Sequence, residues 1–140
     1  MNTSKFTEKS LSALENAHSE AIRCKNSELS TIHLLNSLSF QEKGLVPRIF
    51  EKMEVNYTIL EKSLKKSLLS LPVLSVTSDA RVNTSMELNK ALVRAEDEAS
   101  KMEDEFISVE HLLLALNTER ENCFAGKILK EIGITQDSLL

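Results

Sequence analysis

The sequence has few of the residues that turn-rich or cross-linked folds need. Its 140 residues include 3 glycines, 2 prolines and no tryptophan, and aromatic residues make up 4% of the chain. Because strand-rich domains use more turn-forming and aromatic residues, this scarcity favours an all-α fold. The two cysteines, Cys24 and Cys123, cannot build a disulfide framework. Both lie in segments with helical periodicity, so we expect them to be small buried side chains.

Other absences exclude whole classes of function. No apolar run approaches the roughly 20 residues that span a bilayer, and no hydrophobic stretch opens the chain. We therefore expect a soluble cytoplasmic protein without a membrane partner. The sequence contains no phosphate-binding GxxxxGK[ST] loop, no GxGxxG and no glycine-flanked serine. Its histidines and cysteines form no metal-ligand pattern. We expect no catalytic residues, no metal and no cofactor in this domain.

Charge is distributed unevenly along the chain. Residues 1–70 carry 10 Lys+Arg against 8 Asp+Glu, a net charge of +2, whereas residues 71–140 carry 7 against 13, a net charge of −6. Neither half has the strongly basic patch that nucleic-acid binding requires, so nucleic acid is not expected as a partner. Six acidic residues lie between Glu96 and Glu105, and a run of this kind is most often a solvated helix face.

One structural unit occurs twice in the chain. A shift of 78 residues superposes residues 10–38 on residues 88–116, and ten of these 29 pairs are identical, among them Ser30 with Ser108 and His33 with His111. After the next loop the shift becomes 79. We therefore predict a single domain, residues 1–140, with a first repeat at 1–70, an extended linker at 71–84 and a second repeat at 85–140.

Each repeat is predicted to contain four helices. The first helix of each has an apolar stripe rich in alanine, with spacings of three or four residues: Leu11, Leu14, Ala17, Ala21 and Cys24, then Leu88, Ala91, Leu92, Ala95, Ala99 and Met102. Five helix starts are expected at residues that favour capping: Thr7, Ser30, Asn56, Ser108 and Thr135. Pro47 is expected in the first turn of the third helix.

The helix ends and the linker complete this organisation. Gly133 is expected to take the left-handed conformation at a helix end. The helix beginning at Thr135 is cut short, which suggests an excised domain of a longer protein. The linker has no visible partner strand, so we expect it to lie extended over the surface.

The histidines invite a metal or general-base interpretation, but their positions favour a structural one. His33 and His111 each follow a capping serine by three residues at equivalent positions of the two repeats. Equivalent placement in a duplicated scaffold indicates a shared hydrogen bond near a helix start. His18 aligns with Glu96 and is expected at the surface.

Two segments resemble a known family signature. Phe106–Leu116 reads F-I-S-V-E-H-L-L-L-A-L, and Ser30–Leu38 reads S-T-I-H-L-L-N-S-L. Both are similar to the S-x-E-H-[IL]-L-L-[AG]-L signature of the Clp amino-terminal repeat, although Ile32 stands where that family often has glutamate. The resemblance covers essentially the whole chain. Leu71-Pro72 and the Asp104–Ser108 run are most similar to the ClpB family of protein disaggregases.

This resemblance implies a double-repeat helical bundle that precedes two ATPase modules in a longer, hexameric parent protein. ATP and magnesium would belong to those modules and not to this domain. The domain would engage unfolded or aggregated client proteins and pass them to the ATPase ring. The alternative is an adaptor-docking domain like those of the ClpA and ClpC families, which regulate a protease.

Comparison of the two repeats suggests where clients bind. Glu28 is replaced by Phe106, and Thr31 by Val109. These changes predict extra apolar surface beside an acidic run, suited to segments rich in hydrophobic and basic residues. Phe106 and Val109 filling the core is the alternative.

The resemblance also associates polar residues at Thr7, Asp104 and Glu110 with client handling. Each has a competing structural role. Thr7 is a candidate N-cap, and Asp104 and Glu110 flank a helix start, where negative charge favours the helix dipole. The predicted client-binding residues are therefore Thr7, Asp104, Phe106, Val109 and Glu110.

The 140-residue chain is expected to hydrolyse no ATP and to keep its fold in a metal chelator, because it has no phosphate loop and no ligand cluster. Phosphate release and the far-ultraviolet circular dichroism spectrum in excess EDTA measure the two properties. Turnover by a pure sample, or a chelator-induced loss of helix signal, would contradict this prediction.

Overall fold

Helices dominate the computed structural model, which describes residues 3–74, 82–117 and 124–134. Within these ranges the elements are, in chain order, η1 Thr3–Lys5, α1 Glu8–Arg23, β1 Glu28–Leu29, α2 Thr31–Ser39, α3 Leu45–Lys52, α4 Tyr57–Leu69, β2 Asn83–Thr84, α5 Met86–Lys101, α6 Val109–Leu116 and α7 Phe124–Glu131. The all-α prediction is confirmed. The first repeat has its four helices, whereas the helix expected from Thr135 lies outside the described residues, as does Cys123.

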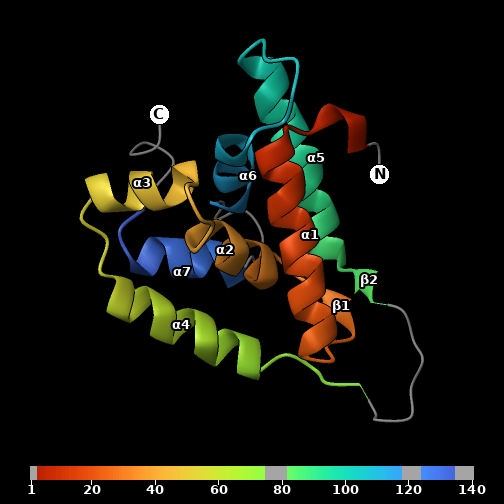
Figure 1. The fold of residues 1–140 in the computed structure, drawn as a ribbon, viewed down its shortest axis with the longest axis vertical. Helices are drawn as coiled ribbons and strands as arrows, with labels where there is room; N and C mark the ends of the chain where they lie inside the picture. The colour runs from red at the N-terminus through yellow and green to blue at the C-terminus, as the bar shows by residue number, and fades with distance from the viewer. Residues whose placement is uncertain (1–2, 75–81, 118–123, 135–140) are drawn as a thin grey trace.

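The two long helices α1 and α5 lie side by side (Figure 1). Each has 16 residues and buries the alanines of its stripe: Ala13, Ala17, Ala21, Ala91, Ala95 and Ala99. Since alanine has only a methyl side chain, these faces let other helices approach closely. The matched lengths and stripes are those expected of one unit used twice.

The buried stripes end at Ala21 and Ala99, three residues earlier than the sequence pattern indicates. Cys24 is exposed, contrary to prediction, and Met102 is 40% exposed. Both are C-cap residues, and the next residues, Lys25 and Glu103, take positive φ values of 55° and 59°. The chain therefore leaves the helical path at the cap, so a side chain there no longer lies in line with the buried face.

Left-handed residues end four of the helices in the same way. After α1 and α5, the amides of Asn26 and Asp104 donate to carbonyls five residues earlier, each at 2.9 Å. After α3 and α7, the left-handed position holds Glu54 (φ 56°) and Gly133 (φ 86°). The prediction for Gly133 is confirmed, and the first repeat adopts the same turn without glycine.

Short stretches of backbone pair each repeat with the other. β1 and β2 form a parallel pair in which Leu29 lies opposite Thr84, and the Ser85 amide donates to the Leu29 carbonyl at 2.9 Å. Phe6 and Ile107 form a parallel bridge, and the Thr7 amide donates to the Ile107 carbonyl at 3.0 Å. These pairs are equivalent under the shift of 78 residues. The segment before the first helix of each repeat thus pairs with the loop before the second helix of the other.

The linker was expected to have no partner strand, and this is wrong at its end. Asn83 and Thr84 pair with β1, and Val73 forms an antiparallel bridge with Asn26. A two-residue strand is too short to show alternation in sequence, yet its backbone groups still require partners when they are covered. Residues 75–81 lie outside the described residues.

The second helix of each repeat supplies much of the core. α2 occupies the middle of Figure 1 and contacts α1, α3, α4, α6 and α7. The leucines of α2 and α6 are buried: Leu34, Leu35, Leu38, Leu112, Leu113, Leu114 and Leu116. Helices so rich in leucine are expected to be buried on most sides. Their contacts with neighbouring loops are made at their first residues.

A histidine fixes the start of each central helix. The Ser30 amide donates to His33 Nδ1 at 2.9 Å, and the Ser108 amide donates to His111 Nδ1 at 2.9 Å. Because an amide donates to Nδ1, the neutral ring carries its proton on Nε2. His33 Nε2 then donates to Asn26 Oδ1 at 2.8 Å. The predicted structural role is confirmed, and His18 is exposed as expected.

Lowering the pH is expected to destabilise the fold through His33. Burial lowers the pKa of His33, a shift that the charge of Glu20 partly opposes. The unfolded chain binds a proton as the pH falls through about 6.5, whereas the folded chain stays neutral. The stabilisation is therefore complete above that pH and is lost below it, by at most about 1.4 kcal/mol per pH unit.

The measurement is the free energy of unfolding by urea at pH 7.5, 6.5 and 5.5, with His33→Gln as the control variant. Glutamine keeps a side-chain acceptor at this capping position and does not titrate. The wild-type chain should lose more stability than the variant over this range. Equal losses would mean that His33 does not contribute.

Candidate partner-binding site

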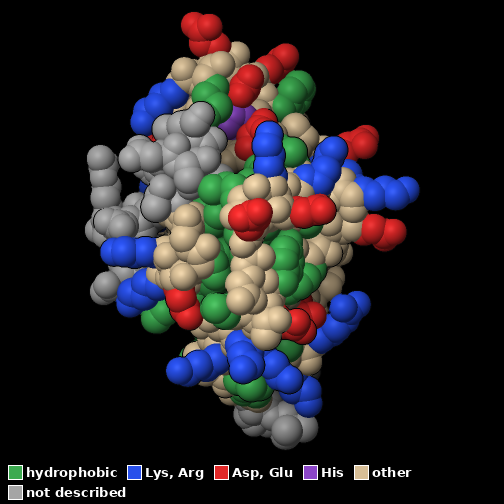
Figure 2. All heavy atoms as spheres, turned by 90° about the vertical axis from the view of Figure 1, so that its left-hand side faces the viewer, with side chains coloured by type: hydrophobic (Ala, Val, Ile, Leu, Met, Phe, Trp, Pro, Cys, Tyr) green, Lys and Arg blue, Asp and Glu red, His purple; other side chains and the backbone are tan. Residues whose placement is uncertain are grey.

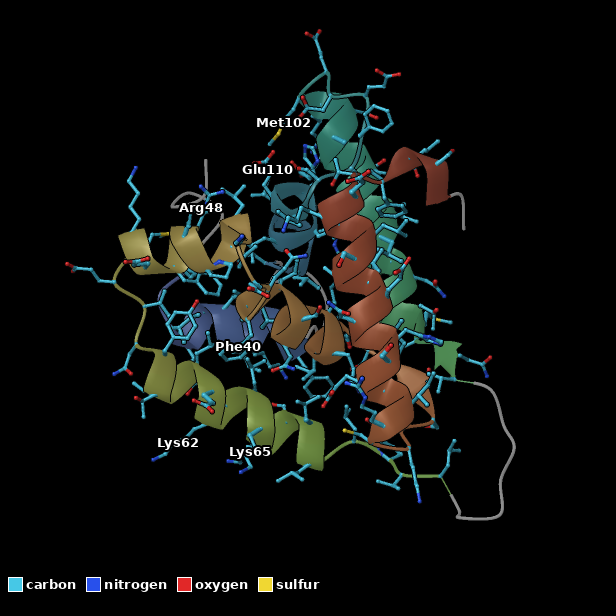
Figure 3. All side chains as sticks on the ribbon, viewed as in Figure 1. Phe40, Arg48, Lys62, Lys65, Met102 and Glu110 are labelled. Atoms are coloured by element: carbon cyan, nitrogen blue, oxygen red, sulfur yellow. The ribbon has the colours of Figure 1, made fainter. Side chains whose placement is uncertain are left out.

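The end of α5 and the start of α6 carry an exposed acidic surface. We call Met102, Glu103, Asp104, Glu105, Phe106 and Glu110 the acidic tip. All six residues are exposed. Figure 3 shows Met102 and Glu110 on the same side of this tip, contributed by α5 and α6 respectively. The tip therefore combines four carboxylates with two apolar side chains.

Asp104 is held by the buried histidine of the second repeat. His111 Nε2 donates to Asp104 Oδ2 at 2.9 Å, with side-chain exposures of 1% for His111 and 48% for Asp104. In the first repeat the equivalent partner is Asn26, which is 2% exposed. We call this arrangement, in which a buried histidine joins the serine at the helix start to a residue of the preceding loop, the histidine clamp; it is present in both repeats. The loop residue changes from the buried amide of Asn26 to the half-exposed carboxylate of Asp104. This contact uses one of the two carboxylate oxygens of Asp104.

Glu110 and Thr7 both have capping roles. Ser108 Oγ donates to Glu110 Oε1 at 2.9 Å, and Glu110 lies in the first turn of α6, where its charge suits the helix dipole. Thr7 is the N-cap of α1, and its Oγ1 accepts from the Ser10 amide at 3.2 Å. The Thr7–Ile107 hydrogen bond at 3.0 Å brings the start of α1 to the loop that carries the tip.

The two apolar replacements in the second repeat have opposite environments. Phe106 is 46% exposed, whereas Val109 is 4% exposed and belongs to the core. The expectation that Val109 adds apolar surface is therefore wrong. In the first repeat, buried Thr31 donates to Glu87 Oε1 at 2.6 Å. The residue equivalent to Glu87 is Lys9, which offers no acceptor, so an apolar side chain fits this position.

Sequence reasoning missed an apolar groove between α1 and α5. Its volume is about 400 Å³. Its lining is mostly apolar and comes from α1, β1, β2 and α5: Leu11, Leu14, Glu15, His18, Ser19, Leu29, Thr84, Leu88 and Leu92. The predicted stripes contained all of these leucines except Leu29, but only the pairing of the two repeats places the stripes beside each other.

Neither a membrane-spanning helix nor a metal-ligand group occurs among the described residues. No helix in residues 3–74, 82–117 or 124–134 is both long and apolar enough to cross a membrane. Within the same ranges, no three histidine, cysteine or acidic side chains come together in a group suited to a metal ion.

Comparison with known sequences identifies the relatives of this chain. The profile of the Clp repeat (R) N-terminal domain matches residues 5–137. Two proteins named chaperone protein ClpB, from Clostridium perfringens and Nitratidesulfovibrio vulgaris, are each 34% identical to this chain over 142 residues. Each match covers 100% of this chain and 16% of the relative. The chain thus spans about one sixth of the length of these curated relatives.

Solved structures show the same fold. The Hsp104 N-terminal domain from Candida albicans has a TM-score of 0.80 and 21% identity, covering 96% of this chain and 86% of that one. The N-terminal domain of the ClpV1 ATPase from Escherichia coli has a TM-score of 0.80 and 24% identity, covering 97% and 82%. A complex of a ClpV N-domain with a VipB peptide has a TM-score of 0.75 and 21% identity, with the same coverage of 97% and 82%.

The contrasting environments of Val109 and Phe106 predict contrasting effects on stability. Val109→Ser should lower the free energy of unfolding by about 1–3 kcal/mol, because it places a hydroxyl in the core. Phe106→Ser should cost about 1 kcal/mol or less, since nearly half of that side chain is exposed. Urea unfolding followed by circular dichroism measures both. Comparable losses in the two variants would contradict these placements.

Proposed function

Since the chain belongs to the Clp repeat (R) N-terminal domain family, we propose that it is the client-binding amino-terminal domain of an ATP-driven disaggregase of the ClpB type. In this proposal it is a binding module and not an enzyme. It engages unfolded or aggregated proteins and passes them to ATPase modules, hexameric in the parent, that lie outside this chain. Its placement in the cytoplasm stays a prediction.

The observation that carries the proposal is the divergence of the two repeats on one backbone scaffold. The acidic tip has Glu103, Asp104, Glu105 and Glu110 where the first repeat has Lys25, Asn26, Ser27 and Ile32. The left-handed turn and the histidine clamp are the same in both repeats. The scaffold therefore does not require these charges, which supports a role in binding.

The composition of the tip suits weak binding of a particular kind of client. Exposed Phe106 offers apolar contact, and the carboxylates attract lysine and arginine side chains at short range. Exposed ion pairs contribute only about 0.2–1 kcal/mol each. Binding should therefore be weak and reversible, as release into a pore requires. Thr7 borders this surface, but its hydroxyl caps α1. Val109 is buried and is therefore not part of the proposed client-binding surface.

The groove between α1 and α5 supports a second candidate function, docking of an adaptor protein. A groove of about 400 Å³ with a leucine-rich lining suits the apolar face of a helix. One solved relative of this fold is a ClpV N-domain in complex with a VipB peptide, so the fold is compatible with peptide binding. Adaptor docking would use Leu11 and Leu88 rather than the acidic tip.

Substitutions at the acidic tip should weaken binding of a permanently unfolded basic protein such as reduced, carboxamidomethylated lysozyme. Phe106→Ser should lower the affinity roughly tenfold through lost apolar burial. Glu110→Gln should lower it roughly two- to fivefold. Titration of the ¹⁵N-labelled chain, followed by amide chemical shifts, measures the affinity and locates the site.

Matched controls separate the two functions. Phe124→Ser removes an aromatic side chain that is 53% exposed, and Glu61→Gln removes one exposed negative charge on α4. Neither control should change the affinity. Leu11→Ser alters the groove and should affect only adaptor docking. Amide shifts confined to the groove, or no shifts at all, would overturn the assignment to the tip.

A further inference from the structure

A second concave surface lies in the first repeat, on elements that the acidic tip does not use. A cavity of about 500 Å³ opens between the end of α2, α3 and the start of α4. Phe40, Pro47, Val55 and Tyr57 form its apolar walls. Figure 2 looks onto the side of the molecule where α3 ends and α4 begins, and hydrophobic side chains gather in the middle of this face, between acidic and basic ones.

Two residues that line the cavity have covered polar atoms without partners. Among the residues that the structure describes, Ser39 Oγ and Gln41 Oε1 are two of three buried side-chain atoms without a hydrogen bond. Ser39 is 1% exposed and Gln41 is 9% exposed. Gln41 Nε2 donates to the Lys9 carbonyl at 2.9 Å, which assigns the amide and leaves Oε1 as the acceptor. Both atoms are covered by the protein, so they lie behind the cavity wall and not on its surface.

The remaining polar groups favour a ligand that donates. Tyr57 Oη already donates to the Ser39 carbonyl at 3.2 Å. Burial and the negative charge of Glu51 both raise the pKa of Tyr57. Glu51, which also lines the cavity, therefore acts electrostatically on its interior. The cavity surface thus offers one carboxylate, that of Glu51, beside apolar and aromatic walls.

Aromatic rings border the cavity, and three cations of α3 and α4 point away from it. Phe40 is 48% exposed and meets Tyr57 edge to face, with ring centroids 5.8 Å apart. Figure 3 shows Phe40 on the inner side of α4, whereas Lys62 and Lys65 extend from its outer side and Arg48 extends from the far side of α3. These three cations therefore do not enter the cavity, which stays open to a positively charged ligand.

We propose that this cavity binds an arginine side chain of a partner polypeptide. A guanidinium group is planar, carries five N–H donors and stacks on aromatic rings. It matches the ring of Phe40 and the charge of Glu51. A lysine ammonium has no planar face for stacking, and an aliphatic side chain would leave the carboxylate without a partner. The inference does not rest on the proposed function, because the acidic tip lies on α5 and α6.

Titration of the ¹⁵N-labelled 140-residue chain with the blocked peptide acetyl-Gly-Arg-Gly-amide tests the proposal. Saturable amide shifts are expected at residues 39–41, at Glu51 and at Tyr57, with a dissociation constant of about 1 mM. The same peptide with citrulline in place of arginine has nearly the same shape without the charge. It should bind about tenfold more weakly, because it forms no charge-assisted hydrogen bond.

Two variants and one control make the outcome specific. Glu51→Gln and Phe40→Ala should each weaken arginine binding about fivefold or more, by removing the charge or the ring. Glu61→Gln makes the same charge change on α4 outside the cavity lining and should leave the affinity unchanged. Equal binding of the two peptides, or equal effects of Glu51→Gln and Glu61→Gln, would overturn the proposal. So would shifts confined to residues 103–110, an outcome that leaves the proposed function intact.

Discussion

The exchange of backbone hydrogen bonds between the two repeats is the constraint on which the rest of the structure depends. Leu29 pairs with Thr84, just before the first helix of the second repeat, and Ile107 pairs with Phe6, just before the first helix of the first repeat. The backbone groups of Leu29 and Ile107 find their partners in the other repeat, and an unpaired covered amide is costly. The exchange therefore ties α1 and α5 to each other's loops. It also brings Thr7 to the base of the acidic tip.

A backbone fixed in this way lets the side chains of the two repeats diverge. The left-handed turn and the histidine clamp hold both loops in the same shape, whether the outer residue is Asn26 or Asp104. Charge at these positions is therefore not a requirement of folding. Internal duplication provides its own comparison, because positions that agree between the repeats serve the scaffold and positions that differ on the surface are available for partners.

Local signals in the sequence predicted the helices well, whereas contacts between distant segments could not be predicted. Capping at Asn56 and the left-handed Gly133 depend on neighbouring residues, so both were predictable. The strand of Asn83 and Thr84 depends on a loop more than fifty residues away. Whether the position shared by Thr31 and Val109 is polar depends on the residue that faces it from the other repeat, because Thr31 donates to the Glu87 acceptor. The cavity beside Phe40 was also not predicted, because the residues that line it become neighbours only when α2, α3 and α4 pack.

The acidic tip and the cavity beside Phe40 have related chemistry on opposite repeats. Each combines an exposed phenylalanine with carboxylate oxygen, at Phe106 with Glu110 and at Phe40 with Glu51. Either surface alone would bind a short peptide weakly, because exposed charge contributes little and ordering the peptide opposes binding. Two weak sites on one folded domain raise the overall affinity only for a polypeptide long enough to reach both. On this arrangement, long unfolded chains would be favoured over short peptides and over folded proteins, whose arginine and apolar side chains cannot reach both surfaces at once.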